Sequence, residues 1–76
     1  MKNNLKVIRA QKSLTQEQLA GMAGISRPAL ALIENEKTVP DGETIAKLVK
    51  ALNMPADQIF FELGVVQTQQ SVGTRT

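Results

Sequence analysis

A pair of helix-start signals separated by a glycine leaves few folds open to this chain. Thr15 can cap one helix, because Gln18 follows three residues later, at the spacing of a capping box. Ser26 can cap a second helix. Gly24 lies between them and tolerates the left-handed backbone found at many helix ends. Residues 14–35 therefore predict two short helices held at a steep angle by a tight turn.

Two helices joined in this way form a helix-turn-helix, whose second helix normally enters the major groove of DNA. The segments LTQEQLA, ISRP and IEN, together with Gly24, resemble the phage-repressor/Cro-like (XRE-type) helix-turn-helix family. The resemblance extends from about Leu5 to Phe60. It implies a lambda-repressor-like domain that binds double-stranded DNA and regulates transcription.

The rest of the sequence predicts three more helices, which gives an all-α fold of five short helices around one core. The first is capped by Asn3 or Asn4 and runs to about Lys12. The fourth follows its cap Asp41, and the fifth covers about residues 56–61. The fourth helix carries the clearest apolar stripe of the chain, at Ile45, Leu48, Val49 and Leu52.

The pattern changes near residue 62, so we expect the DNA-binding domain to span residues 1–62, with the helix-turn-helix at 15–35. Residues 63–70 contain two adjacent valines without a helical stripe, which indicates either a short strand or a frayed tail. A lone strand is unstable, so its expected partner is a second copy of the chain. Residues 71–76 are small and polar and are expected to be disordered. The predicted dimer contacts are Phe61, Leu63, Val65 and Val66.

The helix expected over residues 27–34 supplies the predicted base contacts. Arg27 projects from its first turn, and a guanidinium fork matches the O6 and N7 acceptors of guanine. Pro28, Ala31 and Leu32 lie on its outward face, where apolar side chains can contact thymine methyl groups. The alternative for Leu32 is a core or protein-contact position. Relatives tend to carry polar residues here, whereas this chain carries apolar ones and has little hydrogen-bonding capacity on that face.

Four residues around the same two helices are predicted to contact DNA phosphates: Gln16, Ser26, Asn35 and Lys37. Gln16 opens a helix, where free N–H groups favour an anion. The family resemblance supports this role for Gln16 and for Lys37 in the loop that follows. The simpler alternatives are an exposed helix former at Gln16, a cap alone at Ser26, and a solvated charge at Lys37.

Arg9 and Glu34 are predicted to form a structural ion pair. The family resemblance implies this pairing between the first helix and the end of the third. The alternative is a phosphate contact by Arg9. A partly buried pair loses more stability when one partner is removed than the intact pair contributes.

The composition excludes several kinds of chemistry. The chain has no cysteine and no histidine, and thus lacks thiolates and the usual side chains for general-base catalysis and transition-metal binding. Its carboxylates are scattered, and its five glycines form no phosphate-binding loop. We therefore expect no enzyme activity, no cofactor, no metal site and no small-molecule ligand.

Charge and hydropathy are consistent with a protein that works on DNA away from membranes. The net charge of +2 agrees with a nucleic-acid partner, although such a balance is common among soluble domains. No apolar run reaches the roughly 18–20 residues of a membrane span, and the start of the chain lacks the apolar region of a signal peptide. The expected location is cytoplasmic.

These observations predict a sequence-specific transcriptional regulator, a repressor that binds a palindromic operator as a homodimer. The alternative is a protein-interaction module. In that case the same fold would present an apolar face of Met22, Ala31 and Leu32 to another protein.

Overall fold

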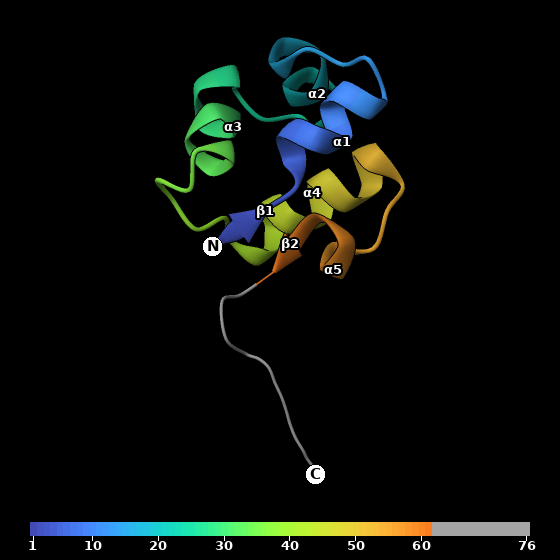
Figure 1. Ribbon diagram of the computed structural model, residues 1–76. Coiled ribbons are helices and arrows are strands. Elements are labelled where there is room, and N and C mark those ends of the chain that lie inside the picture. Colours follow the sequence, from blue (N-terminus) through green and yellow to red (C-terminus); the bar gives the residue numbers. More distant parts are fainter. Residues whose placement is uncertain (62–76) are drawn as a thin grey trace, which may run out of the picture.

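Five helices and one pair of short antiparallel strands make up the regular structure of residues 1–61, the part of the chain that the computed structural model describes (Figure 1). The expected all-α architecture of five helices is confirmed, with a small strand pair added. In chain order the elements are β1 (Lys2–Asn3), α1 (Leu5–Gln11), α2 (Gln16–Ala23), α3 (Arg27–Glu34), α4 (Gly42–Leu52), α5 (Ala56–Ile59) and β2 (Phe60–Phe61).

The starts of α2 and α3 follow from their caps. The Thr15 hydroxyl accepts a hydrogen bond from the Gln18 N–H, and the Gln18 side chain accepts one from the Thr15 N–H, which completes the capping box. The Ser26 hydroxyl accepts from the N–H of Ala29. Gly24 ends α2 with φ of 73°, a left-handed conformation that costs glycine little. The tight turn between the two helices therefore depends on local chemistry.

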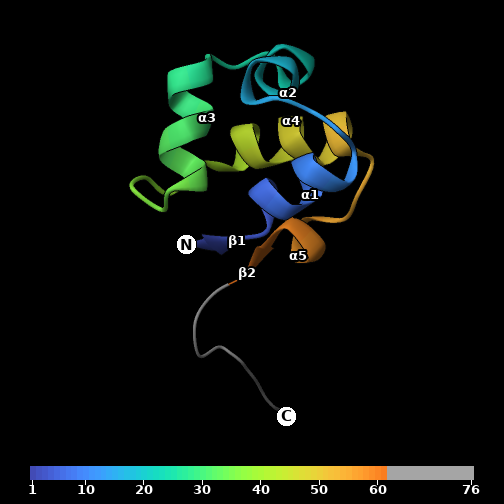
Figure 2. The same cartoon turned by 45° about the horizontal axis from the view of Figure 1, so that its top comes forward.

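The core lies between α4 and the helices around it, and α2 packs against both α3 and α4. Figure 2 shows α4 at the centre, with α2 on one side, α5 on the other, and α3 at the edge of the molecule. Complete burial of a leucine or isoleucine side chain contributes about 1.5–3 kcal/mol. The largest fully buried side chains are Leu5, Leu19, Leu30, Leu48 and Ile59.

The fifth helix is shorter than predicted. It ends at Ile59, and Phe60 is extended, with φ of −121° and ψ of 145°. Phe60 and Phe61 instead pair with Asn3 and Lys2, in an antiparallel register. Nothing in the sequence indicated this pairing, in which the start of the same chain supplies the partner edge for Phe60 and Phe61.

Asn3 is the one of the two predicted caps that bonds the start of α1. Its side-chain oxygen accepts a hydrogen bond from the Leu5 N–H, whereas Asn4 makes no side-chain capping bond. At the end of α3, Asn35 has φ of −87° and the left-handed residue is Glu36, with φ of 61°. The chain thus reverses at Glu36 and not at Asn35, although asparagine is the residue type that tolerates this conformation better.

Several predictions concern residues outside the described part of the chain. They are the strand or tail at residues 63–70, the disorder of residues 71–76, and the dimer contacts Leu63, Val65 and Val66. Within residues 1–61, every helix is too short or too polar to cross a membrane.

Candidate nucleic-acid interface

Helix α3 stands at the edge of the molecule with one side in the core and the other open to solvent (Figure 2). Leu30 and Ile33 are buried on the inner side. On the other side Arg27, Pro28 and Leu32 are exposed and Ala31 is half-buried. Helical periodicity alone separates these two sides. The predicted base contacts therefore lie on the accessible part of the helix.

The predicted phosphate contacts surround α3 at both ends. Ser26 is exposed at its start, and Asn35 and Lys37 are exposed just after its end. Backbone bonds fix this second group, because the Asn35 N–H donates to the Ala31 carbonyl and the Lys37 N–H to the Leu32 carbonyl. Ser26 already satisfies a helix-start N–H through its hydroxyl. Both ends of α3 are therefore accessible from solvent at the positions predicted to contact phosphates.

Arg9 and Glu34 meet where α1 lies close to the end of α3. The Arg9 Nε donates to Glu34 Oε2 at 2.6 Å and its second terminal nitrogen, Nη2, donates to Glu34 Oε1 at 3.0 Å. The Glu34 side chain has no exposed surface, and that of Arg9 is 18% exposed. The hydrogen bond to Glu34 raises the pKa of Arg9 above its ordinary value, against the opposing effect of burial. The pair thus joins α3 to α1.

Gln16 occupies a different place from that of a freely exposed helix start. Its amide nitrogen donates to Glu34 Oε1 at 3.0 Å, so the side chain turns toward the ion pair. Its amide oxygen accepts from Arg27 Nη1 at 3.4 Å. The amide keeps one N–H available for a phosphate. The sequence offered no signal for this contact, because Gln16 and Glu34 lie on different helices and no periodicity relates them.

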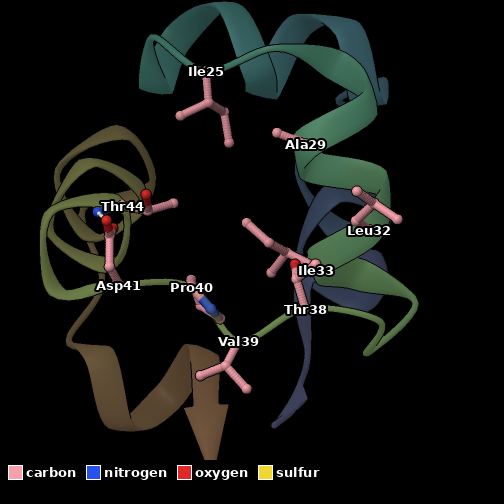
Figure 3. A pocket seen from close by; sticks show the side chains of 9 residues that line it. All are labelled: Ile25, Ala29, Leu32, Ile33, Thr38, Val39, Pro40, Asp41 and Thr44. Atoms are coloured by element: carbon pink, nitrogen blue, oxygen red, sulfur yellow. Dashed lines mark hydrogen bonds between the residues drawn. The ribbon is translucent and has the colours of Figure 1, made fainter.

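The opposite flank of α3 borders a surface pocket of about 320 Å³ (Figure 3). Figure 3 shows Ile25 and Ile33 directed into the space and Leu32 turned outward at its edge. The loop before α4 closes the other side, where Val39 is 69% exposed. Sequence reasoning missed this loop, because residues 38–40 belong to no helix and follow no apolar period. The lining residues are Ile25, Ala29, Leu32, Ile33, Thr38, Val39, Pro40, Asp41 and Thr44.

Asp41 fixes the edge of that pocket by capping α4. Its Oδ1 accepts from the Thr44 N–H at 2.8 Å. Hydrogen bonds from Thr44, through its side chain and its backbone, lower the pKa of Asp41 below its ordinary value of 3.8. The charged carboxylate is therefore the form that stabilises the start of α4.

Three similar proteins are regulators or repressors by name. RghR, a transcriptional repressor of Bacillus subtilis (strain 168), is 36% identical over 64 residues, covering 83% of this chain and 47% of RghR. The uncharacterised regulator MJ0272 of Methanocaldococcus jannaschii is 40% identical over 60 residues, covering 79% and 91%. The immunity repressor of Bacillus phage phi105 is 34% identical over 67 residues, covering 88% and 46%.

The alignments therefore place the chain against about half of RghR and of the phage repressor, and against most of MJ0272. By name, two of the three are transcriptional regulators, the third is an immunity repressor, and none is named as an enzyme. A model of the helix-turn-helix family HTH_3 matches residues 5–59, which include the five helices of the described residues. The chain thus belongs to the XRE-type helix-turn-helix family.

Proposed function

We propose that this protein is a sequence-specific repressor that binds a palindromic operator as a homodimer, with α3 in the major groove. The observation that carries the proposal is that α3 is anchored on its inner side and exposed on its outer side. Its inner side is fixed by Leu30, Ile33 and the buried Glu34, while Arg27 and Leu32 remain exposed. A helix held rigidly with a free outer face is suited to insertion into the groove.

In this proposal Arg27 reads a guanine through its paired donors, and Pro28, Ala31 and Leu32 contact the apolar edge of neighbouring bases. Ser26, Asn35 and Lys37 hold phosphates at the two ends of α3. Gln16 offers its remaining N–H to a phosphate. Few polar groups face the bases, so the shape of the DNA contributes much of the sequence preference.

The proposed dimer uses the end of the domain. Phe61 is 40% exposed on β2, where it can contact a second copy, and the proposal extends this contact through Leu63, Val65 and Val66 in residues 63–70. Residues 1–62 form the DNA-binding domain in this division. Sedimentation of a chain truncated after Phe61 tests the assignment. The truncated chain should be monomeric, and a truncated chain that remains dimeric would contradict the role of residues 63–70.

Selection from a random DNA pool at near-physiological salt tests the function as a whole. We expect a two-fold-symmetric site with half-sites about one helical turn, roughly 34 Å, apart. Arg27→Ala should weaken the free energy of DNA binding by about 1–3 kcal/mol and relax the preference at one base position in each half-site. Binding without any enriched sequence, and only at low salt, would contradict specific recognition.

The pocket beside Leu32 favours a second candidate function, a protein-interaction module. Its apolar lining and the exposed side chains of Leu32 and Val39 offer a surface that a protein partner would cover, and Met22 on α2 is a further exposed apolar residue. Salt distinguishes the two functions. DNA binding through phosphates weakens steeply as salt rises, whereas apolar protein contact changes little.

A further inference from the structure

The Glu34 carboxylate lies at the centre of a hydrogen-bonded chain that ends on the DNA-facing side of the molecule. It accepts two bonds from Arg9 and one from Gln16. Gln16 in turn accepts a bond from Arg27. The chain therefore runs from a fully buried carboxylate, through a half-buried amide, to an exposed guanidinium.

The carboxylate determines which way the Gln16 amide faces. An ionised carboxylate only accepts hydrogen bonds, so the amide nitrogen must be the atom that faces Glu34. The amide oxygen must then face the other way, toward Arg27, which is a pure donor. Arg9 holds the carboxylate in place with a two-pronged contact. Each step thus fixes the orientation of the next.

This arrangement restricts the orientation of Arg27, whose long side chain lies at an exposed helix start. Among the described residues, the amide oxygen of Gln16 is the acceptor that the Arg27 guanidinium contacts. An arginine that must present both prongs to one guanine gains from a restricted range of orientations. Gln16 lies at the first residue of α2 and holds Arg27 at the first residue of α3.

We propose that Glu34 and Gln16 are positioning residues that set the base preference of Arg27. This inference rests on the proposed function, in which Arg27 reads a base. It assigns Gln16 two separate effects. Loss of its phosphate contact weakens binding to all sequences alike, whereas loss of its contact with Arg27 weakens discrimination at one base position.

Relative affinities for the selected operator and for each single-base change separate these effects. Arg27→Ala should reduce discrimination at its base position by about 5–150-fold. Gln16→Leu should reduce discrimination at the same position by at least about twofold, the lower limit for coupled residues. The double variant should discriminate no less well than Arg27→Ala alone. Gln11→Leu, at an exposed position on α1, is the matched control and should match the wild type.

The role of Glu34 requires a variant that still folds. The pair of changes Arg9→Met and Glu34→Leu removes both charges of the ion pair together, which proteins tolerate better than the loss of one. It also removes the acceptor for the Gln16 amide. We expect the same selective loss of discrimination as in Gln16→Leu, with thermal unfolding used to show that the variant is folded.

The outcomes separate this inference from the proposed function. If Arg27→Ala leaves base preference unchanged, then Arg27 does not read a base and the proposed function is contradicted at that residue. If Arg27→Ala relaxes the preference but Gln16→Leu weakens binding equally for every sequence, the positioning role is overturned while the proposed function stands. If Gln16→Leu acts selectively but the double charge variant does not, Glu34 has no part in it.

Discussion

The two flanks of α3 are built from opposite kinds of contact. The polar flank, defined by Arg9, Gln16, Arg27 and Glu34, is closed by directional hydrogen bonds and a buried ion pair. The apolar flank, defined by Ile25, Ala29, Leu32 and Val39, borders an open pocket. Directional contacts fix the orientation of a helix on its domain, whereas an open pocket leaves the side chains beside it accessible. One flank therefore sets where α3 points, and the other is available for contact.

Arg9→Ala tests the polar flank and should have the largest effect. It leaves the Glu34 carboxylate buried without its charged partner, which should cost about 3–5 kcal/mol of unfolding free energy. Chemical denaturation measures the loss. Lys47→Ala is a control, because its ion pair with Glu43 spans 3.7 Å at exposed side chains and should contribute little. Equal stability of the two variants would show that the buried pair does not anchor α3.

Ser26→Ala tests the start of α3, between the two flanks. Loss of the hydroxyl leaves the Ala29 N–H without its acceptor and should destabilise the protein by about 1 kcal/mol. Ser26→Asn provides the control, because its side chain can accept the same bond. A full loss in both variants would mean that the hydroxyl acts in some way other than as a cap.

Leu32→Gln tests the apolar flank. The side chain is 46% exposed, so its replacement should change the unfolding free energy by less than about 0.5 kcal/mol. Thermal unfolding measures this, and Leu30→Gln, at a fully buried position on the same helix, should be far more destabilising. A large effect at Leu32 would mean that the apolar flank contributes to the fold as well.

Asp41→Asn gives the smallest effect and depends on pH. The pKa of Asp41 is lowered in the folded protein, so its charged form contributes stability above the ordinary pKa of 3.8. That contribution disappears as the pH falls through the lowered value. Asparagine still caps a helix but does not titrate in this range. Unfolding free energies between pH 5 and 2 should therefore fall less for Asp41→Asn than for the wild type, and identical pH dependence would contradict the assignment.

The parts of the fold that sequence reasoning could predict are those fixed by nearby residues. The caps Thr15, Ser26 and Asp41 and the turn at Gly24 act within a few positions, so they locate the starts of three helices. The end of α5 could not be predicted this way. Phe60 leaves the helix to pair with Asn3, a residue at the other end of the described chain.

The candidate site divides in the same manner. Periodicity separates the buried Leu30 and Ile33 from the exposed Leu32. The contact between Gln16 and Glu34 joins two helices, and nothing in the local pattern requires it. The pocket lies against a loop, where neither periodicity nor capping applies. Local rules thus predict which residues are accessible, while the contacts between helices that orient them come from the tertiary structure.

The pairing of β1 with β2 has a consequence for the order of folding. Each strand has only two residues. The hydrogen bonds between them cannot offset the entropy lost in closing a loop that contains every helix of the described chain. The strands should therefore meet only after α1 and α5 have docked and brought the ends together. Asn3 then also donates a side-chain bond to the Ile33 carbonyl, at 2.9 Å. In a refolding experiment, protection of the amides in this pair would mark the last step and report that α3 has reached its final place.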